Sequence, residues 1–216
     1  MAPEGKLREA FLGMKRQDAI ESVESELRSG ADPLCLLKEC RGAMDEVGKR
    51  FETGDFFLSE LIYSAEIFKA VSAILRPVLA SDRVAEDSQV RVVFGTARGD
   101  IHDLGKDLVA TMMRAQGFTV YDLGVDVVPE RFISELKESA ATILAISALI
   151  TPALVAMREA ISLLAEEGLR KDTFVIIGGG VTTEFARREV GADAQTLNPA
   201  EAIRLCRQYV HGRPGP

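Results

Sequence analysis

Several residue types are scarce in this sequence, and each scarcity removes a class of protein. The 216 residues include no tryptophan, two histidines and three cysteines. The cysteines are odd in number and form no CxxC pair, so we expect reduced thiols rather than a disulfide framework. No apolar run is long enough to span a bilayer. The segment 1–6 lacks the apolar core of a signal peptide, and we therefore expect a cytoplasmic protein.

Positive charge is also in short supply. The chain has 26 basic and 33 acidic residues, which give a formal net charge of -7. A chain of this sign, with no basic run, is poorly suited to bind nucleic acid or an anionic membrane surface. Its 47% hydrophobic and 27% charged content is typical of a globular protein. We therefore expect no nucleic-acid partner and no membrane partner.

Helical periodicity dominates the first 80 residues. Apolar residues recur at the three- and four-residue spacing of amphipathic helices, and Asp32-Pro33 is a typical helix start. Pro77 predicts a kink or an early end of the last of these helices. The pattern predicts a small helical bundle over 1–80, with helices over 18–28, about 33–51 and about 58–79. The polar segment 81–89 is predicted to be a linker.

The remainder of the chain alternates apolar runs with amphipathic segments. This alternation predicts a parallel sheet with right-handed crossovers, covered by helices on both faces. The fold class is thus α/β: a helical cap followed, over 90–212, by a Rossmann-like (flavodoxin-like) domain. Five strands are predicted near 90–97, 119–124, 142–147, 173–177 and 194–197. Helices are predicted near 105–116, 129–139, 152–167, 182–190 and 199–209.

The stretch Gly99-Asp100-Ile101-His102-Asp103-Leu104-Gly105 connects the first predicted strand to the first helix of the α/β domain. Open α/β sheets bind their ligands at loops of this kind. Asp100 can hold one ring nitrogen of His102 and leave the other directed outward. The loop contains neither a P-loop nor a dinucleotide-binding glycine pattern. No second histidine or nearby cysteine completes a zinc or iron site.

Two further strand ends are expected at the same edge of the sheet. Ser147 and Thr151 follow the third strand, and Gly178, Gly179 and Gly180 follow the fourth. A run of glycines lets a large group approach the backbone closely. Simpler interpretations are that the hydroxyls cap the next helix and that the glycines form a tight turn.

Together these pieces resemble the cobalamin-binding module of B12-dependent methyltransferases. The family signature is Asp-x-His-x-x-Gly, then Ser-x-Leu, then Gly-Gly. In this sequence 41 residues lie between Gly105 and Ser147, and 28 lie between Leu149 and Gly178, which is similar to the family's spacing. The resemblance covers about residues 15–210. In layout the chain is similar to the stand-alone corrinoid proteins that serve methanol, methylamine or methoxy-aromatic methyltransferases.

The resemblance extends to the helical half. The segments 47–54 (VGKRFETG) and 57–61 (FLSEL) resemble the cap domain of the family. There, apolar residues at the positions of Phe51, Leu58 and Leu61 cover the upper face of the corrin. The simpler interpretation of these residues, and of Leu61 above all, is that they belong to the core of the bundle. A cap must also move aside for partner enzymes, and 81–89 is where we expect the hinge.

The resemblance implies a cofactor, cobalamin, bound base-off, with its nucleotide tail inserted into the α/β domain. His102 would be the axial ligand to cobalt, and Asp100 would accept a hydrogen bond from its other ring nitrogen. Asp103 and Gly105 complete the motif. The slot for the tail would be formed by Ser147, Leu149, Thr151, Gly178, Gly179 and Gly180. Some relatives extend the His–Asp relay with a serine that is Ala153 here, so the relay is expected to stop at Asp100 or to continue through water.

The implied function is that of a methyl carrier that cycles between cob(I)alamin and methylcobalamin. Its partners would be a substrate-specific methyltransferase, a second methyltransferase that acts on tetrahydrofolate or a thiol, and a reductive activator of the corrinoid. The chain alone would be a carrier, because it has no separate substrate site. Two alternatives are a B12-dependent regulator, which usually adds a DNA-reading domain, and a mutase-type module for adenosylcobalamin. A generic flavodoxin-like domain would explain neither the spacings nor the cap.

Overall fold

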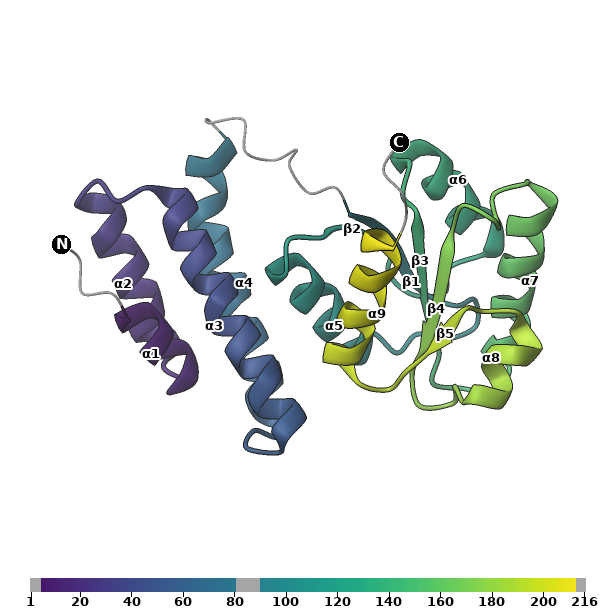
Figure 1. Cartoon of the computed structure of the whole chain (residues 1–216), viewed down its shortest axis with the longest axis horizontal. Helices are drawn as coiled ribbons and strands as arrows, with labels where there is room; N and C mark the ends of the chain where they lie inside the picture. Colours follow the sequence, from purple (N-terminus) through teal and green to yellow (C-terminus); the bar gives the residue numbers. More distant parts are fainter. Residues whose placement is uncertain (1–4, 81–89, 213–216) are drawn as a thin grey trace. The chain divides into compact units, whose positions relative to one another are not determined.

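The computed structural model describes residues 5–80 and 90–212, which form two compact units. The first unit is helical, and the second contains the sheet (Figure 1). The predicted linker, 81–89, lies outside the described residues. Within the described ranges, no helix is both long and apolar enough to cross a bilayer.

Four helices build the first unit: α1 (Lys6–Leu12), α2 (Arg16–Arg28), α3 (Pro33–Thr53) and α4 (Leu58–Ala80). The three helices expected from the periodicity are present. Helix α1 was not predicted, because seven residues with three buried apolar side chains are too few to establish a period. The expectation that Pro77 ends α4 early is wrong, since the helix continues to Ala80. Pro77 lies in the last turns, where the loss of one N–H donor interrupts little of the helix.

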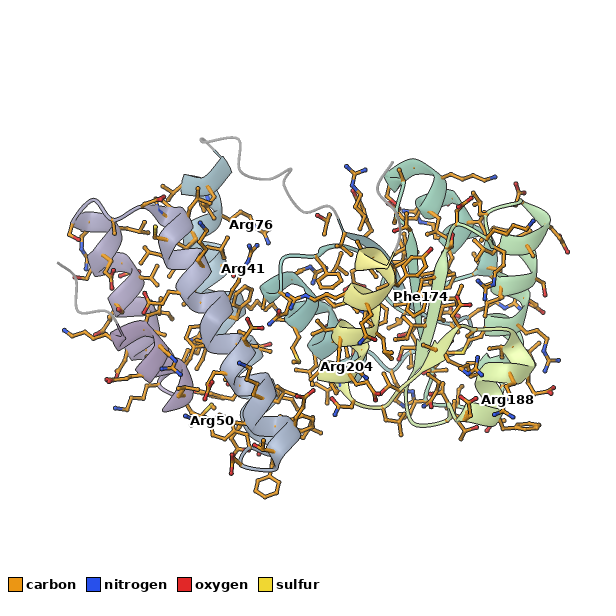
Figure 2. The ribbon with its side chains drawn as sticks, in the orientation of Figure 1. Arg41, Arg50, Arg76, Phe174, Arg188 and Arg204 are labelled. Carbon is orange, nitrogen blue, oxygen red and sulfur yellow. The ribbon has the colours of Figure 1, made fainter. Side chains whose placement is uncertain are left out.

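The connection between α3 and α4 is held by local contacts. Gly54, with φ 83°, closes α3 in the left-handed conformation that glycine adopts without strain. The Arg50 guanidinium lies 5.2 Å from the centre of the Phe56 ring (Figure 2). The Glu60 carboxylate accepts a hydrogen bond from the Phe57 N–H, 2.9 Å away, at the start of α4. These contacts order a connection that carries exposed apolar side chains.

The second unit alternates strands and helices as predicted. The strands are β1 (Arg91–Thr96), β2 (Thr119–Asp122), β3 (Ile143–Ser147), β4 (Phe174–Gly178) and β5 (Ala194–Gln195). The helices are α5 (Leu104–Ala115), α6 (Pro129–Ser139), α7 (Ala153–Glu166), α8 (Glu184–Val190) and α9 (Pro199–His211). All of these boundaries agree with the predicted ones to within two residues, and β2 and β5 each end two residues earlier than predicted.

All five strands are parallel, in the order β2-β1-β3-β4-β5. Helices α5 and α9 cover one face of the sheet, and α6, α7 and α8 cover the other (Figure 1). A core of buried residues from β1, β3 and β4 packs against α6 and α7. The predicted α/β class with a helical N-terminal unit is confirmed. Successive strands are added on one side of β1 up to β2 and on its other side from β3 onward, so the strand order reverses between β1 and β3. Sheets of this type bind ligands at this position.

Candidate functional site

The structure brings the three predicted strand ends together. In the parallel register Thr96 of β1 pairs with Ser147 of β3, and Ser147 pairs with Gly178 of β4. The loops that follow these strands therefore leave the sheet side by side at its carboxyl edge. The strands β1 and β3 also flank the position where the strand order reverses. The sequence motifs thus converge at the ligand-binding edge expected for an open α/β sheet.

The centre of this edge is a histidine held by a buried carboxylate. Asp100 Oδ1 lies 2.6 Å from His102 Nδ1 and accepts a hydrogen bond from the His102 backbone N–H at 3.0 Å. The Asp100 side chain is fully buried, whereas the His102 side chain is 54% exposed. Since Nδ1 is engaged by the carboxylate, Nε2 is the ring nitrogen left for an external partner.

The second oxygen of Asp100 joins the β1 loop to the β3 loop. Oδ2 accepts hydrogen bonds from the backbone N–H groups of Leu149 and Ile150, the latter at 3.2 Å. Burial acts to raise the pKa of this carboxyl. The hydrogen bonds that it accepts outweigh burial and hold its pKa below the ordinary value. Asp100 is therefore a buried carboxylate that orients a histidine and links the loops that follow β1 and β3.

Two further side chains hold the histidine loop, and the sequence analysis did not identify either. The Thr96 hydroxyl, which is fully buried, donates to the His102 carbonyl oxygen at 3.1 Å. The Asp126 carboxylate, which follows β2, accepts from the Gly99 N–H at 2.7 Å. The available signal was a polar residue at the end of the first strand, Thr96, and another four residues beyond the end of the second, Asp126. Without the strand order, that signal did not connect Asp126 to His102.

The glycines after β4 have different reasons to be glycine. A Cβ at Gly179, which has φ 98°, would lie 2.1 Å from the Ala148 carbonyl oxygen. The chain's own backbone therefore requires glycine there, independently of any ligand. A Cβ at Gly180 would meet only the Leu149 side chain, at 2.8 Å. These contacts show that the β3 and β4 loops pack tightly against each other.

Gly105, unlike Gly179, is not required to be glycine by packing within the chain. It lies in the first turn of α5, it is exposed, and a Cβ placed on it would meet no atom within 4 Å. Nothing in the described chain requires a glycine at this position. Asp103, two residues earlier, is also exposed. Lys106, which follows Gly105, is buried and forms ion pairs with Asp107 and Asp122. Open space thus lies next to a well-anchored helix start.

The residues after β3 lie at this edge but do not cap the next helix. Ser147 is half-buried, Thr151 is exposed, and the Leu149 side chain is 49% exposed. Helix α7 begins after Pro152 with no side-chain capping bond. The capping interpretation of the two hydroxyls is therefore wrong. Ala153, at the relay position, is fully buried.

In the helical unit the three predicted cap residues differ in exposure. Leu58 is 53% exposed, Phe51 is half-buried and Leu61 is fully buried. Their burial places Leu61 in the bundle core, as the simpler interpretation held, and leaves Leu58 and Phe51 with accessible surface. Phe57, which the sequence analysis did not select, is 71% exposed beside Leu58.

Apolar side chains are also exposed on the histidine loop. Ile101 and Leu104 are 73% and 67% exposed on either side of His102. Large exposed apolar groups that cluster with a polar centre mark binding surfaces more often than an isolated exposed leucine does. Within the described residues, no group of three or more histidine, cysteine or acidic side chains is arranged to hold a metal ion.

Both halves of the chain match protein families of known type. A B12 binding domain family matches residues 90–204, and a second B12 binding domain family matches residues 4–76. The chain is 35% identical over 210 residues to dimethylamine corrinoid protein 3 of Methanosarcina acetivorans. That alignment covers 96% of this chain and 98% of the relative. Each half of the chain therefore has its own B12-binding match.

Solved structures agree. A cobalamin-binding protein from Desulfitobacterium hafniense DCB-2 is 33% identical, with a TM-score of 0.71, over 94% of this chain and 96% of the other. The methanol:cobalamin methyltransferase complex MtaBC from Methanosarcina barkeri has the same fold, with a TM-score of 0.83 at 23% identity over 96% of this chain and 79% of that one. The predicted family and cofactor class are confirmed. The chain belongs to the family of B12-binding corrinoid proteins, and its cofactor is a corrinoid.

Proposed function

We propose that this chain is a methyl carrier that binds cobalamin base-off, with His102 as the axial ligand to cobalt. The observation that carries the proposal is the Asp100–His102 pair at the reversal point of the sheet. A fully buried carboxylate 2.6 Å from Nδ1 fixes the ring, and the half-exposed side chain presents Nε2 outward. An imidazole oriented by a carboxylate is the usual arrangement of a histidine metal ligand.

The residues around His102 fit a large, mostly apolar ligand. Ile101 and Leu104 offer exposed apolar surface beside the imidazole, and Gly105 leaves space that a side chain would fill. When bound, the corrin cobalt supplies the site that accepts and releases a methyl group. The chain's own contribution is to hold the ring, orient one nitrogen and shield its surroundings.

The nucleotide tail of the cofactor is assigned to the carboxyl edge beside β3 and β4. Ser147 ends β3 and pairs in the register with Gly178, which ends β4. Leu149 and Thr151 follow on the β3 loop, and Gly180 follows on the β4 loop. Gly179 supports the slot indirectly, because it allows the β4 loop to pack on Ala148. Asp103 lies exposed on the loop between β1 and α5 and completes the motif.

In the helical unit, Phe51 and Leu58 are assigned to cover the corrin. Both have accessible apolar surface, which a covering role needs, whereas Leu61 supports them from the bundle core. Excluding water and oxidants protects a reactive corrinoid from side reactions. Partner enzymes then need access, so the cap is proposed to move aside. The segment 81–89, where the sequence analysis expects the hinge, lies outside the described residues.

The proposed partners follow from the carrier role. A substrate-specific methyltransferase supplies the methyl group, and a second methyltransferase passes it to tetrahydrofolate or a thiol. The relative named a dimethylamine corrinoid protein makes a methylamine the first donor to test. A reductive activator restores the corrinoid after adventitious oxidation.

The decisive experiment compares the visible absorption spectra of the full chain and its His102→Ala variant, each reconstituted with methylcobalamin. We expect a base-off, histidine-ligated spectrum in the wild type that is lost in the variant. His211→Ala is the matched control, because it removes the chain's other histidine and is expected to leave the spectrum unchanged.

Three results would overturn parts of the proposal. Failure of the wild type to retain the corrinoid would remove the carrier role. An unchanged spectrum in His102→Ala would keep the cofactor but exclude His102 as its ligand. Loss of the spectrum in His211→Ala would transfer the ligand assignment to the other histidine.

A further inference from the structure

The connection between β2 and α6 grips the histidine loop through one residue. The Asp126 carboxylate accepts a hydrogen bond from the Gly99 N–H at 2.7 Å. The Asp126 backbone N–H in turn donates to the Asp100 carbonyl oxygen at 2.9 Å. One residue therefore binds the two peptide groups of the loop that flank the Gly99–Asp100 peptide, just before His102.

The hydrogen bonds of Asp126 to the loop lie next to backbone pairing at the edge of the sheet. Ala97 and Val127 form a parallel bridge just beyond the ends of the strands. The Val127 N–H donates to the Thr96 carbonyl oxygen at 2.9 Å. Asp126 is thus tied to the sheet by its neighbour, while its own polar groups reach the loop. The loop cannot shift along the strand direction without breaking several of these bonds.

Asp126 occupies a backbone conformation that has a cost. Its φ is 55°, in the left-handed region that few residues other than glycine adopt. Asparagine and aspartate tolerate this region better than other side chains do, at a cost of about 1 kcal/mol. Strain of this kind persists where the surrounding contacts hold it in place. Here those contacts lead to the loop that carries Asp100 and His102.

We propose that Asp126 is a positioning residue for His102. It holds the Gly99 N–H and the Asp100 carbonyl oxygen, so that the Asp100 carboxylate meets both the His102 ring and the β3 loop. Thr96 supports the same loop from the other end, through the His102 carbonyl oxygen. Asp126 acts through Gly99 and Asp100 and has no contact of its own with the imidazole. This inference rests on the proposed role of His102 as a ligand.

Three variants separate the carboxylate from the backbone. Asp126→Asn keeps an acceptor oxygen and tolerates positive φ. Asp126→Gly removes the acceptor but relieves the backbone strain. Asp126→Ala removes the acceptor and keeps the strain. Because glycine and asparagine both accept this conformation, the test still stands if the alanine variant does not fold.

The matched control is Asp193→Ala. Asp193 also holds a backbone amide, the Val175 N–H at 2.8 Å, but it precedes β5 at the opposite edge of the sheet. Its loss is expected to weaken folding without altering corrinoid ligation. A second control, Ala140→Gly, relieves another positive φ, 51°, at the end of α6.

The first readout uses the full chain reconstituted with methylcobalamin. For Asp126→Gly and Asp126→Ala we expect a smaller histidine-ligated fraction in the visible spectrum and about three- to tenfold weaker retention of the corrinoid, the scale of one lost hydrogen bond. Asp126→Asn is expected to stay close to the wild type. Wild-type ligation in Asp126→Gly, or an equal loss in Asp126→Asn and Asp126→Ala, would overturn the proposal.

The second readout needs no cofactor. Amide hydrogen exchange at Gly99 in the apoprotein should be about three- to tenfold faster in Asp126→Gly than in the wild type, and close to the wild-type rate in Asp126→Asn. If the wild type itself lacked histidine ligation, the proposed function would fail, and this exchange would show separately whether Asp126 holds the loop. Unchanged exchange in Asp126→Gly would overturn the positioning role.

Discussion

The two edges of the sheet each contain an aspartate that binds backbone amides, but the remaining partners of the two carboxylates differ. At the amino edge, Asp193 accepts from the Val175 N–H and from both terminal nitrogens of Arg170, at 2.7 and 3.0 Å. At the carboxyl edge, Asp100 binds backbone amides and the His102 ring. In the described part of the chain, no lysine or arginine forms an ion pair with Asp100.

The difference separates a structural carboxylate from one that serves a site. At Asp193 the forked guanidinium of Arg170 and the Val175 N–H engage both carboxylate oxygens, so this carboxylate serves to hold the chain together. Asp100 is buried without a cation, and a buried charge needs compensation. Its compensation comes from oriented amides and an imidazole whose second nitrogen is free for a ligand. The carboxyl edge is therefore the one prepared for binding.

The largest loss of stability at the carboxyl edge is expected for Gly179→Ala. Its Cβ would overlap the Ala148 carbonyl oxygen, and its φ of 98° would strain any other residue. We expect a loss of about 2–4 kcal/mol in the free energy of unfolding, measured by chemical denaturation. Gly180→Ala is the control, because its Cβ meets only a flexible leucine side chain, and a loss below about 1 kcal/mol is expected. Equal losses would mean that the backbone contact at Ala148 has no special weight.

The direct test of the contrast is the pair Asp100→Ala and Asp193→Ala. Removing Asp100 leaves buried amides without an acceptor, so we expect a loss of about 2–3 kcal/mol in unfolding free energy. The partly exposed Asp193 is expected to contribute about 1 kcal/mol. Only Asp100→Ala should change the spectrum of the methylcobalamin-reconstituted chain. A spectral change in both variants would end the distinction between the two edges.

The smallest expected effect on folding, and the opposite one in sign, comes from Gly105→Ala. The new Cβ meets no atom of the chain, and alanine favours a helix over glycine, so stability should rise by about 0.5 kcal/mol. Retention of methylcobalamin should fall about tenfold, equivalent to 1.4 kcal/mol, because the side chain occupies space assigned to the cofactor. Unchanged retention, measured by equilibrium dialysis, would show that no cofactor atom lies near Gly105.

Most of the fold could be predicted from local pattern. The alternation of buried strands and amphipathic helices over 90–212 depends on residues that are neighbours in the chain, and the structure follows it closely. The helix α1 was missed because Leu7, Ala10 and Phe11 are too few to define a period. The prediction that Pro77 could end α4 early overestimated its effect, because a proline removes only one backbone N–H donor and few residues of the helix follow it.

The candidate site was predictable only where chemistry and spacing were local. The Asp100–His102 pair is separated by one residue, so the contact between carboxylate and imidazole follows from the motif itself. The partners of Asp100 on the β3 loop are 49 and 50 positions away, and they meet it because β3 lies beside β1. Asp126 was overlooked for the same reason, because it reaches the histidine loop from the connection after β2. Thr96 lies only six residues before His102 and is not part of the motif, so nothing in the motif selected it.

By itself, the sequence determined the two-part organisation of this protein, its helices and strands, its family and the contact between Asp100 and His102. These depend on short-range periodicity and on residue types at set spacings. The tertiary structure decided which loops meet and which carboxylates hold the histidine loop. It also decided that packing within the chain requires glycine at position 179 but not at position 105. Hydrogen bonds between strand ends depend on the order and register of the strands, which no local pattern of residues specifies.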